Sequence, residues 1–311
     1  MNYRHGYHAG NFADVLKHAV LARILAHLRL KAKPFRVIDT HAGRGAYDLG
    51  SEEARRTGEW RDGIGRLAIG GPGLDGLGLD GLGLDGLGVE RIGSGKPGPG
   101  DSTDPLAAFL APYLEAVSSW RAEHGAFAYP GSPAIARHFL RRDDRLVAVE
   151  AQERVFAKLE RLFPAGGRAK ALRLDGYTAW NAFVPPKERR GLVVVDPPFE
   201  APDEFAKVSA SLEAAVKKWP SGAVLIWYPV KDRDLVARFT ERLKRLALPD
   251  AWRVEFDCDA IGEGVAGLAA CGLILVNPPW TLPEELRAAL PRLAALLARG
   301  PRPRASCGRL A

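Results

Sequence analysis

Residues 191–199, G-L-V-V-V-D-P-P-F, decide the fold. Their four apolar residues, mostly β-branched, predict a short strand that is buried on both faces. The strand must end at Pro197, because proline has no N–H to donate inside a sheet. Asp196 is therefore expected at the carboxyl end of a buried strand, which is where open α/β sheets bind their ligands.

The residues after this strand suit the exocyclic amine of a flat base. Asp196 can accept one N–H of such an amine and the Pro197 carbonyl the other, which frees the nitrogen lone pair for attack on a methyl group. Phe199 offers a stacking face for a base removed from its own stack. The alternative is a strand followed by a Pro-Pro turn, with Asp196 only solvated, since a four-residue match is a hypothesis.

Composition points to a soluble globular protein of 311 residues, with 47% hydrophobic and 26% charged residues. The 44 basic and 37 acidic side chains give a net charge of +7, which mildly favours a polyanionic partner such as nucleic acid. Three cysteines without C-x-x-C spacing predict neither disulfides nor a zinc site. His5 and His8 lack a third ligand, so no metal is expected. Without a signal peptide or a membrane span, we expect a cytoplasmic protein.

A Gly-rich turn at residues 41–45, H-A-G-R-G, follows a predicted strand at residues 36–40. Such a turn lets a ligand approach the backbone, and we expect the N-terminus of a helix behind it. Asp48 stands where the dinucleotide fingerprint needs Gly or Ala, which weakens a dehydrogenase interpretation. D-x-x-x-G-x-G resembles instead the S-adenosylmethionine loop of class I methyltransferases.

Two more strands are predicted to end in acids, at Glu150 and at Asp175. A carboxylate in the position of Glu150 commonly accepts both ribose hydroxyls of a bound nucleoside. Strands that alternate with helices predict a doubly wound, mostly parallel sheet. We expect seven strands, at residues 36–40, 145–150, 171–175, 191–195, 223–230, 252–257 and 272–276.

The seventh strand ends in N-P-P-W at residues 277–280, so Asn277 rivals Asp196 for the chemistry. In the usual methyltransferase order the fourth strand lies beside the first, and the seventh lies near the far edge of the sheet. That order favours Asp196, by analogy.

Residues 51–127 interrupt the α/β alternation and predict a small helical insertion. It contains a low-complexity loop at residues 70–104, with three copies of L-D-G-L-G, and a helix from Pro105. The methyltransferase domain would then comprise residues 1–50 and 128–311, with an N-terminal substrate and cofactor motif at 1–31. The tail at residues 301–311 is expected to be flexible and basic.

Six motifs occur together and in order, and their combination resembles the RlmJ family. They are Y-R-H-G-Y-H-A-G-N-F-A-D-V-L-K-H (3–18), D-T-H-A-G-R-G-A-Y-D-L (39–49), Y-P-G-S-P (129–133), V-V-V-D-P-P-F (193–199), W-Y-P-V (227–230) and V-N-P-P-W (276–280). The resemblance covers nearly the whole chain apart from residues 70–104 and the tail. Phe199, where many relatives have Tyr, and the L-D-G-L-G copies depart from the family pattern.

The resemblance implies a class I S-adenosylmethionine-dependent methyltransferase, a Rossmann-like α/β protein that methylates adenine N6 in 23S ribosomal RNA. It implies that Asp196, Pro197 and Phe199 are catalytic. The implied cofactor-binding residues are His18, His41, Gly43, Ser132, Glu150, Asp175, Gly176 and Asp196. The implied substrate-binding residues are Tyr3, Arg4, Lys17 and Phe199.

Two other functions stay open on the sequence. A DNA adenine-N6 methyltransferase shares D-P-P-F, and only the N-terminal block argues against it. A catalytically silent RNA-binding protein could have the same fold, although the intact D-P-P-F and Gly-rich turn oppose that. We expect a monomer without an obligate protein partner or a membrane association.

Overall fold

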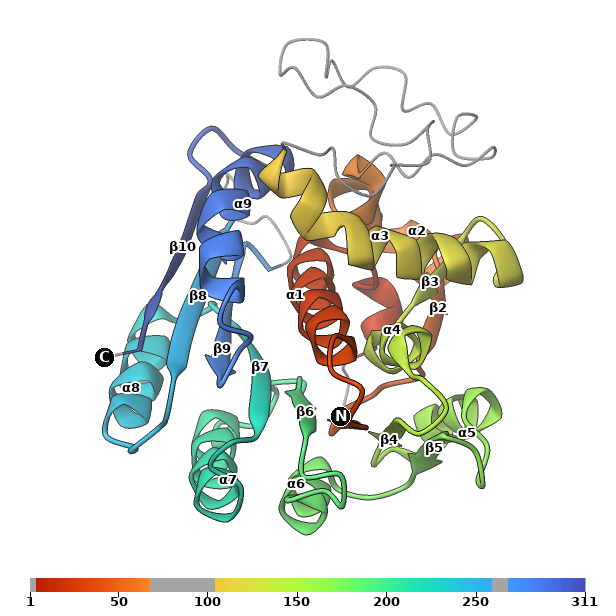
Figure 1. Ribbon diagram of the computed structural model, residues 1–311. Coiled ribbons are helices and arrows are strands. Elements are labelled where there is room, and N and C mark those ends of the chain that lie inside the picture. The colour runs from red at the N-terminus through yellow and green to blue at the C-terminus, as the bar shows by residue number, and fades with distance from the viewer. Residues whose placement is uncertain (1–3, 68–103, 259–267, 311) are drawn as a thin grey trace.

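The computed structural model describes residues 4–67, 104–258 and 268–310. Its main feature is a sheet of eight strands in the order β10-β8-β9-β7-β6-β1-β4-β5 (Figure 1). These strands span Arg36–Asp39 (β1), Arg145–Val149 (β4), Ala169–Leu172 (β5), Gly191–Val195 (β6), Ala223–Pro229 (β7), Ala251–Asp257 (β8), Ala270–Val276 (β9) and Arg304–Arg309 (β10). A separate two-stranded sheet pairs Ala46–Asp48 (β2) with Ala128–Pro130 (β3).

The strand from the deciding stretch, β6, lies at the centre of this sheet. All five of its residues are buried, and it pairs in parallel with β1 on one side and β7 on the other. The predicted order is confirmed, because the fourth of the expected strands lies beside the first. Strand β9 runs antiparallel between β7 and β8.

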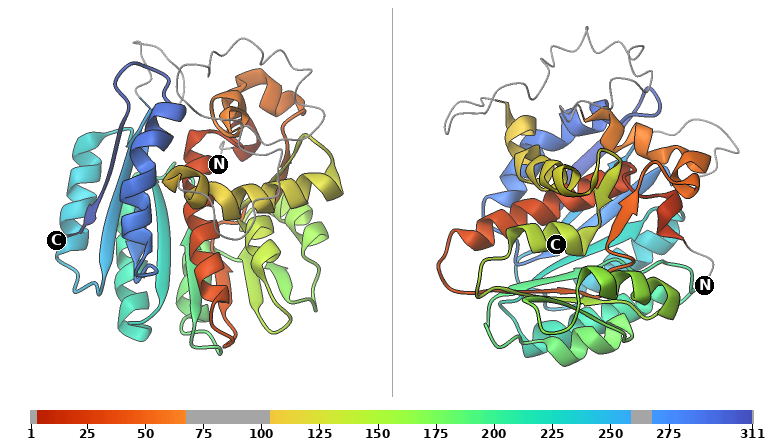
Figure 2. Two further views of the ribbon diagram at one scale, coloured as in Figure 1. Left: turned by 45° about the horizontal axis from the view of Figure 1, so that its top comes forward. Right: turned by 90° about the vertical axis from the view of Figure 1, so that its right-hand side faces the viewer.

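Helices cover both faces of the sheet (Figure 2). Alternate residues of β6 point to opposite faces: Leu192 and Val194 pack in the cluster with α1, α4 and α9, while Val193 and Val195 pack with α6, α7 and α8. The helices span Phe12–Arg29 (α1), Glu52–Thr57 (α2), Pro105–His124 (α3), Ser132–Phe139 (α4), Glu153–Leu162 (α5), Gly176–Phe183 (α6), Glu204–Lys218 (α7), Arg233–Lys244 (α8) and Leu282–Leu296 (α9).

Helix α1 begins where the sequence predicts it. The Asn11 side chain accepts hydrogen bonds from the N–H groups of Ala13 and Asp14, both at 3.0 Å, and so caps the helix. The helix is buried on almost every side, because α3, α4 and β9 all pack against it. This burial fixes the polar residues of α1 in place.

Three expectations about secondary structure were wrong. The tail is not flexible throughout, because Arg304–Arg309 adds an eighth strand, β10, to the expected seven. No helix follows the Gly-rich turn, since the chain enters the short strand β2 at Ala46. Strand β5 ends at Leu172, so Asp175 is not its last residue but the cap of α6.

The segment expected to be an insertion contains α2, α3 and two short 3-10 helices, η2 at Glu59–Asp62 and η3 at Ile64–Arg66. Helix α3 contacts α1, α9 and β3, so it lies across the helices of one face rather than along the sheet (Figure 1). Nearly all of the low-complexity loop lies outside the described residues, and the domain boundaries stay a prediction. Among the described helices, none has the length and apolarity needed to span a bilayer.

Candidate active site

A cavity of about 1410 Å³ opens at the carboxyl ends of β1, β4, β6 and β7. Such a volume exceeds that of a typical small-ligand pocket, about 300–1,000 Å³. Most of the predicted site residues line it, and they come from seven different elements or turns. They are Arg4, Lys17, His18, His41, Gly43, Ser132, Glu150, Asp175, Gly176, Asp196 and Pro197.

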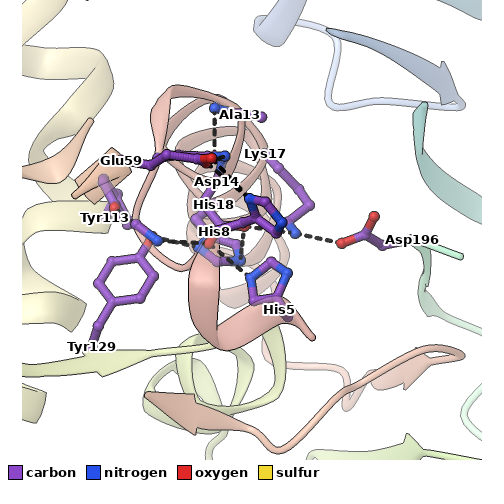
Figure 3. Close-up of polar contacts among 12 residues, drawn as sticks. His5, His8, Ala13, Asp14, Lys17, His18, Glu59, Tyr113, Tyr129 and Asp196 are labelled. Atoms are coloured by element: carbon purple, nitrogen blue, oxygen red, sulfur yellow. Dashed lines mark hydrogen bonds and ion pairs between the residues drawn. The ribbon is translucent and has the colours of Figure 1, made fainter. Parts of the chain in front are cut away.

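Asp196 is bound by a lysine from α1 (Figure 3). Lys17 Nζ lies 2.5 Å from Asp196 Oδ2 and 2.9 Å from Asp14 Oδ1, so one ammonium bridges two carboxylates. The Lys17 and Asp14 side chains are only 5% and 2% exposed. Among the described residues, no group other than Lys17 makes a hydrogen bond to the Asp196 carboxylate, so Oδ1 keeps an open acceptor position on a residue that lines the cavity.

Charge pairing keeps this buried cluster ionised. Burial alone would raise the pKa of Asp14, but its interactions with His5 and with the Lys17 ammonium hold that pKa well below its usual range. Burial alone would lower the pKa of Lys17, but Asp14 and Asp196 hold it well above its usual range. Two further bonds hold the Asp14 carboxylate, since its Oδ2 accepts from the Gly10 N–H at 2.9 Å and lies 3.0 Å from His5 Nε2.

His41, from the Gly-rich turn, is a neutral imidazole of defined tautomer. Burial lowers its pKa to about 4. The Thr40 hydroxyl donates its one proton to the Val194 carbonyl at 2.9 Å, so toward His41 Nδ1, 2.8 Å away, it must act as an acceptor. His41 therefore carries its proton on Nδ1 and has a bare Nε2.

Gly176 is required by the close approach of this imidazole. A Cβ at position 176 would lie 2.4 Å from the Thr40 carbonyl oxygen and 2.7 Å from the His41 ring. Any other residue would displace the turn that follows β1.

Two carboxylates lie at the other end of the cavity. Glu150 follows β4, and its Oε1 accepts from the Gln152 N–H at 2.7 Å; burial raises its pKa. Asp175 caps α6, because its Oδ1 accepts from the Thr178 N–H at 2.8 Å and from the Thr178 hydroxyl at 2.9 Å. Asp175 thus has a structural role, and only its second oxygen could also bind a ligand.

Asn277, the rival of Asp196, lies at the other end of the strands, where the parallel strands have their amino ends. Because β9 is antiparallel to β7, its carboxyl end meets the amino end of β7, where Val224 pairs with Val276. Asn277 Nδ2 donates to the carbonyl oxygens of Pro220 and Gly222, both at 2.8 Å, and Asn277 is not among the described residues that line the cavity. The Asn277 side chain therefore links the turn after β9 to the turn before β7.

We expect Asn277→Ala to lower stability and to leave turnover nearly unchanged. The variant loses two hydrogen bonds and places Ala at a φ of 48°, which together cost about 2–3 kcal/mol of unfolding free energy. Denaturant unfolding measures the loss, and Asn277→Gly, which tolerates this φ, isolates the hydrogen-bond part. Loss of turnover in the folded variant would instead implicate Asn277 in the chemistry.

Three predicted substrate residues need separate comment. Tyr3 lies outside the described residues. Arg4 is 68% exposed at the cavity, with its guanidinium 4.0 Å from Glu53. Phe199 has a φ of 49° and packs against Phe205 and Trp227, at ring distances of 4.7 and 6.0 Å, and it is not among the described residues lining the cavity. A stacking role for Phe199 would require its ring to turn from this position.

Sequence reasoning missed Asp39, the last residue of β1. Its side chain is 1% exposed, and among the described residues neither carboxyl oxygen has a hydrogen-bond partner. Burial raises its pKa to about 7, and the nearby Asp196 carboxylate acts in the same direction. The sequence R-V-I-D predicts a strand, but nothing in it indicates that the acid at its end, Asp39, is buried behind the Gly-rich turn.

Asp39→Asn should stabilise the protein at alkaline pH. The folded-state pKa of about 7 lies above the unfolded value of about 3.9, so the favourable contribution is complete below pH 4 and is lost as pH rises to 7. Relative to wild type, the gain in unfolding free energy should therefore be larger at pH 8.5 than at pH 5, by about 2 kcal/mol. Chemical denaturation at the two pH values tests this, and a gain independent of pH would contradict it.

The sheet order, the Gly-rich turn after β1 and the cavity at the carboxyl ends of the parallel strands define a class I methyltransferase. The comparisons agree with this class. A family model described as "Ribosomal RNA large subunit methyltransferase D, RlmJ" matches residues 32–70 and 100–304. The chain belongs to the RlmJ family, as its motifs predict.

Two curated relatives carry the name "Ribosomal RNA large subunit methyltransferase J". The one from Escherichia coli (strain K12) is 34% identical over 301 residues, and the one from Haemophilus influenzae is 33% identical over 300. Each alignment covers 96% of this chain and 94% of the relative. A crystal structure of a Legionella pneumophila protein is 29% identical, with a TM-score of 0.77, over 97% of this chain and 98% of that one.

Proposed function

We propose that this protein methylates the exocyclic N6 of an adenine in 23S ribosomal RNA, with S-adenosylmethionine as the methyl donor. The observation that carries the proposal is the Asp196 carboxylate at the carboxyl end of β6, with one oxygen held by Lys17 and an open acceptor position on the other. Membership of the RlmJ family supports the RNA substrate. We further propose a cytoplasmic monomer.

The residues of the cavity fit this cofactor. Glu150 offers a carboxylate to ribose hydroxyls, and Gly43 and Gly176 keep the backbone close to the cavity. His18 and His41 are neutral, so they place no positive charge beside a sulfonium, while Asp14 and Asp196 are acidic. S-adenosylmethionine, when bound, supplies a methyl group activated by its sulfonium. Ser132 and Asp175 would complete the binding set.

Asp196 would act by orienting the amine. Its Oδ1 accepts one N6–H, the Pro197 carbonyl accepts the other, and the nitrogen is drawn toward tetrahedral geometry at close range to the methyl group. Lys17 fixes the carboxylate through Oδ2. Methylation would leave N6 cationic, and Asp196 or water would then take one proton from it.

The choice between RNA and DNA can be tested directly. Purified protein is incubated with methyl-labelled S-adenosylmethionine and either unmodified large-subunit RNA or duplex DNA, and label in each polymer is counted. We expect label in RNA alone. Label in DNA alone would assign the alternative DNA methyltransferase, and calorimetric binding of the cofactor without any label would favour a silent RNA-binding protein.

A further inference from the structure

A chain of buried hydroxyl groups leads from helix α3 to the cavity (Figure 3). Tyr113 Oη on α3 lies 2.9 Å from Tyr129 Oη on β3, and Tyr129 Oη lies 2.9 Å from His18 Nδ1 on α1. Tyr113 and Tyr129 are 0% exposed and His18 is 1% exposed. Because the three groups are sealed from water, their protons must be shared among themselves in a fixed pattern.

Two proton patterns satisfy these bonds. In the first, Tyr113 donates to Tyr129 and Tyr129 donates to His18 Nδ1, so His18 carries its proton on Nε2. In the second, His18 Nδ1–H donates to Tyr129 and Tyr129 donates to Tyr113, so His18 Nε2 is bare. Burial lowers the pKa of His18 to about 3, so the imidazole is neutral and one of these patterns must hold.

In the second pattern the buried Tyr113 proton has no acceptor among the described residues, so the hydroxyl pair itself favours the first pattern. The surroundings of Nε2 favour the first pattern as well. His18 Nε2 lies 3.9 Å from Asp14 Oδ1, and Asp14 is ionised through its contact with Lys17. A bare nitrogen would direct its lone pair toward this carboxylate in a site of low dielectric constant, whereas an N–H would direct a positive dipole toward it. Electrostatics therefore favours the proton on Nε2.

We propose that the Tyr113–Tyr129 hydroxyl pair is a positioning device that fixes His18, a residue that lines the cavity, in its Nε2–H tautomer. The two cavity-lining histidines then have opposite tautomers, with the proton on Nε2 in His18 and on Nδ1 in His41. Through these two hydrogen bonds, helix α3 influences the site, although none of its described residues lines the cavity. The tautomer itself does not depend on the proposed function, whereas the effect on S-adenosylmethionine affinity rests on it.

The tautomer can be measured by NMR on the full chain labelled with ¹⁵N at histidine. Two-bond ¹⁵N–¹H correlations distinguish Nδ1–H, Nε2–H and doubly protonated rings, and His18→Gln assigns the His18 signals by their loss. In wild type at pH 7.5 we expect His18 in the Nε2–H form. Wild-type His18 in the Nδ1–H form, or doubly protonated, would overturn the proposal before any tyrosine is changed.

Tyr129→Phe removes only the hydroxyl that bonds His18. We expect a mixture of tautomers and a cofactor Kd raised about threefold to tenfold by calorimetry, the loss of one net hydrogen bond. Tyr113→Phe should change the tautomer ratio less, because Tyr129 can still donate. Tyr228→Phe is the matched control. Tyr228 is 0% exposed, its hydroxyl accepts from Arg253 Nε at 3.2 Å, and it is not among the described residues that line the cavity. Neither the His18 tautomer nor the cofactor Kd should change in this variant.

An unchanged His18 tautomer in Tyr129→Phe would overturn the proposal. A changed tautomer with unchanged Kd would keep the hydroxyl chain and remove its role in cofactor binding. These readouts need no RNA, so a protein that failed to methylate RNA would contradict the proposed function and leave the tautomer result intact.

Discussion

Asp196→Ala should reduce methyl transfer by at least about a hundredfold and change the affinity for S-adenosylmethionine by less than about tenfold. A positioned acceptor of this kind contributes about 10²–10⁴-fold to rate. The fold should survive, because Lys17 keeps its 2.9 Å contact with Asp14 when Asp196 is removed. Single-turnover kinetics and calorimetry on the same preparation separate the two effects.

The matched control for Asp196→Ala is Asn277→Ala, the same truncation in the second N/D-P-P-aromatic element. Near-normal transfer by Asp196→Ala, with loss of transfer by Asn277→Ala, would contradict the assignment of the catalytic strand. The antiparallel direction of β9 makes the opposite result the expected one.

Lys17→Met should destabilise the protein by about 3–5 kcal/mol. Removing the cation from a buried pair leaves an uncompensated charge, and here Asp14 and Asp196 would face each other across the space that the ammonium had occupied. Denaturant unfolding measures this loss, and transfer should fall as well, because Asp196 is no longer held.

A double-mutant cycle separates the charge from the shape of the side chain. Asp14→Asn combined with Lys17→Met removes both members of the more deeply buried of the two pairs, so its cost should be smaller than the sum of the single costs by more than about 1 kcal/mol. Additive costs, or an unfolding free energy for Lys17→Met within about 1 kcal/mol of wild type, would show that the bridge contributes little.

The centre of the fold could be predicted because its signals are local. The apolar run before Asp196 and the two prolines after it fix both the strand and its end. Strand β10 was missed although Ala305 and Cys307 alternate with polar residues, because the prolines and arginines around them are also typical of a loose tail. The weak period-2 pattern of an edge strand does not outweigh that composition.

The contacts that organise the site could not be predicted, because they join distant parts of the chain. Lys17 and Asp196 are 179 residues apart, and nothing in the pattern of a helix indicates which strand end a lysine will reach. Tyr113 and Tyr129 look like core residues of a helix and a turn until the structure places their hydroxyls beside His18. The position of Phe199 depends on a backbone turn with positive φ that its sequence does not demand.

The most direct test of the account is the identity of the methylated nucleoside. Large-subunit RNA is treated with the protein and methyl-labelled S-adenosylmethionine and digested to nucleosides, which are separated by retention and mass. We predict that N6-methyladenosine carries all of the label, and that Asp196→Ala yields none above background. Label in N4-methylcytidine, or in any nucleoside methylated on carbon, would contradict the assignment of adenine N6 as the reacting atom.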